Sequence, residues 1–153
     1  MNAVTQGMMK KFAVNQHVTS FIGGESLTPS GPGEDIPVIS PITESQIALL
    51  REASIDEVDS AVRTARDAFE NGPWRHMSVD QRKVIMLQIK DVILAHADEL
   101  AYLESLNAGL TMTYVKGLHV MRTGWNFEFF AEVASQASGE AYTQTKPYLS
   151  VVT

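Results

Sequence analysis

The hydrophobic pattern of this chain changes its period once, at Ser54, and this change restricts its possible folds more than any other feature. Before Ser54 the apolar residues form short runs at positions 36–40 and 46–51, as is typical of strands. After Ser54 they recur at steps of three and four, which places one apolar stripe on a helix. The stripe consists of Ile55, Val58, Ala61, Val62, Ala65 and Phe69. The sequence therefore predicts a β-rich start followed by helices.

Two capping boxes mark where helices begin. In Ser54-Ile-Asp-Glu57 and in Ser78-Val-Asp-Gln81, the serine oxygen and the side chain three residues later each accept a free backbone N–H. The first helix is expected to end at Asn71-Gly72-Pro73, because glycine and proline interrupt helices.

The rest of the chain predicts two more helices and a final strand. One helix is expected over about 97–106, stopping at Gly109, and a longer one over about 113–137, closed by Gly139. Residues 148–153 are β-branched and predict a strand with no partner in view. Its sheet is then expected to lie in residues outside this sequence.

Turn signals organise the N-terminal part. Paired glycines, Gly23 and Gly24, within residues 18–27 predict a short hairpin, because glycine tolerates positive φ angles. The runs at 36–40 and 46–51 suit two antiparallel strands joined by a turn. Residues 1–17 have no clear periodicity and are expected to form a flexible arm.

Composition excludes several classes of function. The chain has 153 residues, 44% of them hydrophobic, and a net charge of −6, so it offers no broad basic surface for nucleic acid. No apolar stretch approaches the roughly 20 residues that a membrane helix needs. The absence of cysteine excludes disulfides and thiolate metal sites, and suits a cytoplasmic location.

Several short motifs occur in a consistent order and spacing. They are Phe21-Ile22-Gly23-Gly24, Ile39-Ser40-Pro41-Ile42-Thr43-Glu44, Glu57-Val58-Asp59-Ser60-Ala61-Val62, Gly72-Pro73-Trp74-Arg75, Leu103-Glu104-Ser105-Leu106-Asn107-Ala108-Gly109, Phe129-Phe130-Ala131 and Gly139-Glu140. In this order they resemble the N-terminal part of the NAD(P)-dependent aldehyde dehydrogenase family. Each motif is weak alone, and the resemblance rests on their order.

The resemblance implies an α/β fold. Residues 18–153 would be part of a Rossmann-like nucleotide-binding domain, with short strands, four helices and a final strand, truncated before the cofactor and catalytic motifs. The family oxidises aldehydes to carboxylic acids with NAD or NADP, through attack of a cysteine thiolate on the carbonyl carbon. Its members commonly form homo-oligomers. Because this chain has no cysteine, we expect it to contain no catalytic residue, and to show neither tight NAD binding nor turnover by itself.

Two sets of site residues are implied by the resemblance. A monovalent cation would be held near Val38, Ile39 and Asn107, weakly, because asparagine stands where the family commonly has a charged aspartate. The last helix lines the aldehyde channel in the family, and there Leu118, Arg122 and Trp125 correspond to the channel face. An arginine at this position would favour a substrate that carries an acid group. Alternatively, Arg122 is a solvated surface charge and Trp125 a core aromatic.

Two other interpretations stay open. The chain could be a stand-alone helical interaction domain that keeps the family's helices without its chemistry, which would require a self-contained core. It could also be a decayed gene fragment with no independent role.

Overall fold

The structure is a computed structural model and describes residues 17–28, 33–136, 139–143 and 149–152. Most of the predicted N-terminal arm lies outside these residues. His17, the last residue assigned to the arm, begins strand β1 (His17–Val18), which pairs in parallel with Leu49 and Leu50 of strand β5. His17 is therefore part of the sheet, and residues 1–16 of the predicted arm lie outside the described residues.

The glycine-centred hairpin is confirmed. Strands β2 (Phe21–Ile22) and β3 (Glu25–Ser26) pair antiparallel. Gly23 and Gly24 between them have φ angles of 65° and 89°. These are left-handed conformations that residues with a side chain rarely adopt. The two glycines therefore permit this tight turn.

The two predicted antiparallel strands are also confirmed. Strand β4 (Asp35–Ile39) pairs with strand β5 (Gln46–Arg51), and β1 lies on the other side of β5 to give the order β1-β5-β4. The register shifts between Val38 and Ile39, which is a β-bulge. A bulge leaves one residue outside the ladder and bends the strand.

Both capping boxes form as predicted. Ser54 begins helix α2 (Ile55–Asn71), with the Ser54 Oγ 3.2 Å from the Glu57 backbone nitrogen and a Glu57 carboxylate oxygen 2.7 Å from the Ser54 nitrogen. Helix α2 ends at Gly72, and the 3₁₀ turn η1 (Pro73–His76) comes next. Ser78 begins helix α3 (Val79–Ala95) in the same way as Ser54 begins α2.

Helix α4 (Ala97–Ala108) and the helical segment after it form most of the buried core. Helix α4 ends at Gly109, where φ is 76°, as the sequence predicts. One cluster joins Ile47 of β5 to Tyr102 and Leu106 of α4. A second joins Ala101 of α4 to Val115 and Val120 beyond it.

The predicted fourth helix contains a π-helical turn. Helix α5 (Met112–Tyr114) runs into the π turn η2 (Val115–Val120) and then into helix α6 (Met121–Ala134). Val115 and Val120 are both buried although they are five residues apart. In a regular α-helix such residues point about 140° apart. The wider π turn brings both side chains into the core.

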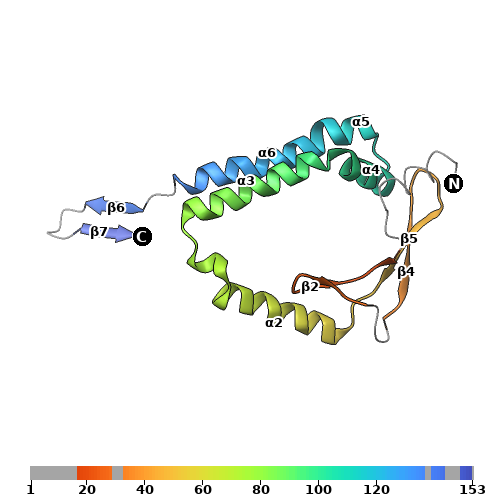
Figure 1. Cartoon of the computed structure of the whole chain (residues 1–153), viewed down its shortest axis with the longest axis horizontal. Helices are drawn as coiled ribbons and strands as arrows, with labels where there is room; N and C mark the ends of the chain where they lie inside the picture. The colour runs from red at the N-terminus through yellow and green to blue at the C-terminus, as the bar shows by residue number, and fades with distance from the viewer. Residues whose placement is uncertain (1–16, 29–32, 137–138, 144–148, 153) are drawn as a thin grey trace.

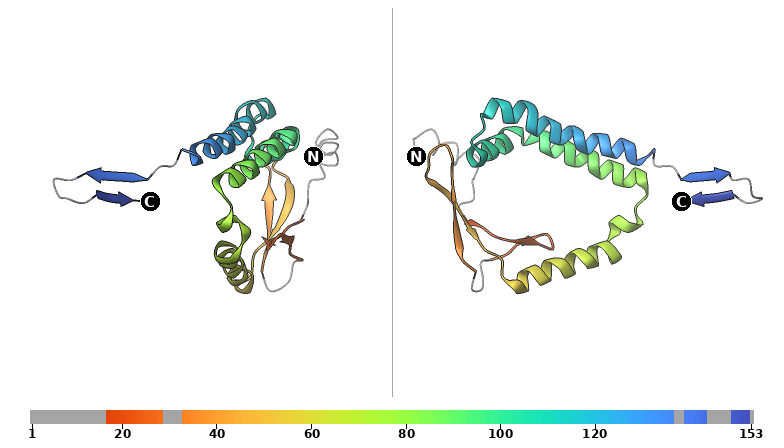
Figure 2. Two further views of the ribbon diagram at one scale, coloured as in Figure 1. Left: turned by 60° about the vertical axis from the view of Figure 1, so that its left-hand side comes forward. Right: turned by 180° about the vertical axis from the view of Figure 1, so that it is seen from behind.

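Helices α3 and α6 lie side by side and antiparallel, and the β1-β5-β4 sheet stands at one end of the molecule (Figures 1 and 2). Helix α2 runs separately from them and contains no buried residue. Its apolar stripe is exposed: Ile55 is 82% exposed, Val62 64% and Phe69 67%. An exposed stripe of this size is typical of a surface that packs against more protein.

The expectation of a final strand without a partner is wrong. Strand β7 (Leu149–Val152) pairs antiparallel with strand β6 (Glu140–Thr143), which the sequence pattern did not predict. The two form a separate hairpin beyond α6 (Figure 1). The partner was missed because Glu-Ala-Tyr-Thr is short and has little apolar alternation. The partner of β7 therefore lies a few residues earlier in this chain, not outside it.

Candidate functional site

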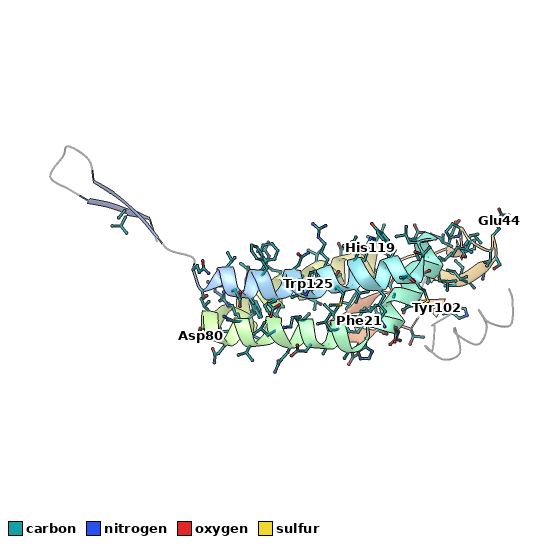
Figure 3. The ribbon with its side chains drawn as sticks, turned by 90° about the horizontal axis from the view of Figure 1, so that it is seen from above. Phe21, Glu44, Asp80, Tyr102, His119 and Trp125 are labelled. Carbon is teal, nitrogen blue, oxygen red and sulfur yellow. The ribbon has the colours of Figure 1, made fainter. Side chains whose placement is uncertain are left out.

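The three residues predicted to line a substrate channel lie on the helical segment that runs from η2 into α6. Leu118 belongs to η2, and Arg122 and Trp125 belong to α6. Leu118 is 41% exposed and Trp125 55% exposed, and Arg122 is exposed as well. Trp125 is therefore not a core aromatic in this structure. Figure 3 shows Trp125 and His119 along this segment, with α3 beside it.

Contacts with α3 fix the rotation of α6. Gly124 is buried, and a Cβ built there would lie 3.1 Å from Leu94 Cδ2, so a larger residue would require the Leu94 side chain to shift. One turn later, the Lys90 Nζ lies 2.8 Å from the Glu128 Oε1. The hydrogen bond from Lys90 to Glu128 raises the pKa of the Lys90 ammonium above its ordinary value. Because Gly124 and Glu128 face α3, Arg122 and Trp125 lie on the exposed surface of α6.

Arg122 keeps its full hydrogen-bonding capacity. Among the described residues it makes no hydrogen bond and no ion pair. By contrast, Lys116 in η2 places its Nζ 2.7 Å from Asp98 Oδ1. A guanidinium presents a planar fork of donors that matches a carboxylate. Among the described residues, the exposed surface of α6 thus offers an unpaired cation, Arg122, one turn from the Trp125 ring.

The structure partly brings together the residues predicted to hold a cation. Val38 and Asn107 line one pocket of about 310 Å³, together with Ile47 and Leu106, whereas Ile39 is half exposed and does not line it. Asn107 is the one polar side chain in the described lining. No group of three or more His, Asp or Glu side chains in the described part could hold a metal. Any cation here would depend on neutral oxygens.

Ser40 holds the two halves of this site together, and the sequence alone did not identify it as a functional residue. It is fully buried, and its Oγ donates to the Leu106 carbonyl oxygen at 3.0 Å. The same Oγ accepts the Ile42 backbone N–H at 3.3 Å. This links the end of β4 to the residue before Asn107. A lone serine in a turn carries no sequence signal of such a long-range contact.

The sequence and fold match known proteins. The family model for the aldehyde dehydrogenase family matches residues 27–153. The chain belongs to the aldehyde dehydrogenase family. It is 33% identical to aldehyde dehydrogenase 1 of Tanacetum cinerariifolium, over 96% of this chain and 31% of that protein. It is 32% identical to 2-hydroxymuconic semialdehyde dehydrogenase of Pseudomonas sp. strain CF600, over 86% of this chain and 27% of that protein.

Solved aldehyde dehydrogenases share this fold. The NAD⁺ complex of the Bacillus cereus aldehyde dehydrogenase matches with a TM-score of 0.81 and 28% identity, over 99% of this chain and 30% of that one. The resemblance inferred from the sequence is thus confirmed at the level of the family. The chain spans about a third of the length of these relatives.

In the described residues no helix is both long and apolar enough to cross a membrane.

Proposed function

We propose that this chain is the N-terminal part of an oxidoreductase that oxidises an aldehyde to a carboxylic acid with NAD or NADP. The cysteine that forms the thiohemiacetal lies outside this chain, which contains none. The match of 99% of the chain to a solved aldehyde dehydrogenase supports this most strongly. We further propose that the complete protein is a cytoplasmic homo-oligomer that binds neither nucleic acid nor membranes.

The described residues do not fit a dinucleotide by themselves. The paired glycines Gly23 and Gly24 lead into strand β3, whereas a phosphate-binding turn leads into a helix N-terminus. NAD or NADP, which would accept the hydride, is therefore held mainly by residues outside this chain. Residues 18–153 then act as part of the nucleotide-binding domain and supply one wall of the substrate channel.

The exposed stripe on α2 disfavours a stand-alone interaction domain. Such a domain needs its own core, but Ile55, Val58 and Phe69 are each more than half exposed. In the proposed enzyme the remaining two thirds of the protein would cover this stripe. If this chain by itself stays a monodisperse monomer, that result would instead favour the interaction domain.

Arg122 is proposed to select aldehydes that carry an acid group. The test uses a chimera in which this chain replaces the matching 30% of the Bacillus cereus enzyme. Replacing Arg122 by leucine should lower kcat/KM for succinic semialdehyde about 10- to 100-fold, because a charge-assisted hydrogen bond contributes about 1.5–3 kcal/mol. Butyraldehyde, which lacks the carboxylate, should be oxidised at an unchanged rate.

Lys116→Leu is the matched control for Arg122→Leu. It removes the same charge from the same helical segment, but Lys116 is paired with Asp98. It should leave the ratio of the two kcat/KM values unchanged. Unchanged kcat/KM for both substrates in the Arg122→Leu chimera would show that Arg122 is only a solvated surface charge. An equal loss on both substrates would show a structural role without selection for the acid group.

Val38, Ile39 and Asn107 are proposed to hold a monovalent cation weakly, through backbone carbonyls at the bulge and the Asn107 amide oxygen. Asn107→Asp should strengthen binding, because a carboxylate adds a full charge to neutral donors. The melting temperature of this variant should then rise by roughly 2–4 °C more in potassium chloride than in choline chloride of equal ionic strength. Asn126→Asp, an exposed change on α6, is the control. Equal responses of both variants would refute the site.

A further inference from the structure

A second pocket, which the proposed function does not use, lies beside the π turn. It has a volume of about 370 Å³ and is formed where α3, α4, η2 and α6 meet. Its walls are mainly apolar, from Ile93, Leu100, Val115 and Val120. A concave apolar site with a few polar groups is the usual form of a small-molecule site.

The π turn shapes this pocket. It places Val115 and Val120, five residues apart, on the same side, where they form part of the wall. It also widens the helix, and the Thr123 Oγ1 donates to the His119 carbonyl oxygen at 2.8 Å. The Thr123 hydroxyl therefore already has a hydrogen-bond acceptor within the helix. π turns of this kind occur frequently at functional sites.

The charge in the pocket is negative. Glu104 is the one acidic residue in the described lining, and no lysine or arginine lines it. Among the described residues Glu104 makes no hydrogen bond or ion pair. The nearby cation of η2, Lys116, is paired with Asp98. His119 also lines the pocket, and its ring packs edge-on against Tyr114, with the ring centroids 5.1 Å apart.

We propose that this pocket binds a small protonated amine with an apolar body. The apolar part would pack against Ile93, Leu100 and the two valines, and the ammonium would pair with the Glu104 carboxylate. The proposal stands independently of the dehydrogenase activity, because it uses only residues of this chain and no cofactor.

The test is a titration of the 153-residue chain with benzylamine, monitored by NMR of the Val115 and Val120 methyl groups. Benzyl alcohol, a neutral molecule of similar shape, is titrated in parallel. We expect saturable shifts with benzylamine at millimolar concentration and weaker binding of benzyl alcohol. Glu104→Gln should weaken benzylamine binding about fivefold, the effect of losing about 1 kcal/mol of an exposed ion pair.

Two further variants complete the test. Glu99→Gln removes a carboxylate from the same helix, but Glu99 faces His96 at 3.1 Å and not the pocket, so benzylamine affinity should not change. Leu100→Trp should fill the pocket and abolish the methyl shifts. Absence of saturable shifts in the unmodified chain would overturn the proposal. So would equal affinity for benzyl alcohol, or unchanged affinity in Glu104→Gln.

Discussion

Replacing Val115 by aspartate is expected to destabilise the chain by more than about 4 kcal/mol. Val115 is fully buried at the junction of α4 and the π turn, packed with Ala101 and Val120. A carboxyl group there has no cationic partner in the described core. Its burial therefore costs a large free energy, whether the group is charged or protonated. Because small domains are stable by only about 5–15 kcal/mol, most of the folding free energy would be lost.

Urea unfolding monitored by circular dichroism measures this loss. Val133→Asp on α6 is the matched control, because Val133 is 42% exposed and its replacement leaves the new carboxylate in water. The control should change the free energy of unfolding by less than about 0.5 kcal/mol. If both variants unfold at the same urea concentration as the original chain, Val115 does not lie in a core.

Replacing Ser40 by alanine should lower the free energy of unfolding by about 2–3 kcal/mol, because a buried polar group left without a partner costs about 1–3 kcal/mol. The change removes the donor to the Leu106 carbonyl and the acceptor for the Ile42 N–H, both at a fully buried position. The same change should also reduce the response of the melting temperature to potassium, because Ser40 holds the Val38 strand against Asn107.

Ser45→Ala is the control for Ser40→Ala. Within the described part of the chain, the Ser45 hydroxyl makes its hydrogen bond with the Thr43 hydroxyl, at 2.7 Å and exposed to solvent. Its loss should have little effect on unfolding by urea. If Ser40→Ala is as stable as Ser45→Ala, the contact between β4 and α4 contributes nothing to the fold.

Local signals in the sequence predicted local structure well. The Ser54 and Ser78 boxes and the Gly109 cap act within one helical turn, so the residues that form them are neighbours in the chain. Gly23 and Gly24 predicted their hairpin for the same reason. The family, too, could be predicted, because its motifs recur in order.

Long-range features could not be predicted in this way. The pairing of His17 with Leu49 and the hydrogen bond from Ser40 to Leu106 join segments far apart in the chain. The π turn was hidden because the five-residue step from Val115 to Val120 fits neither a helical nor a strand period. The sequence could name the residues of the candidate sites. It could not predict that Trp125 is exposed, because this depends on how α6 packs against α3.

Aldehyde-dependent formation of NADH tests the central claim most directly. It would be measured for the 153-residue chain alone and for the chimera that joins it to the remainder of the Bacillus cereus enzyme. We predict no NADH from the chain alone, since it has no cysteine, and turnover of succinic semialdehyde by the chimera. Turnover by the chain alone would contradict the claim, as would a folded, NAD-binding chimera that forms no NADH.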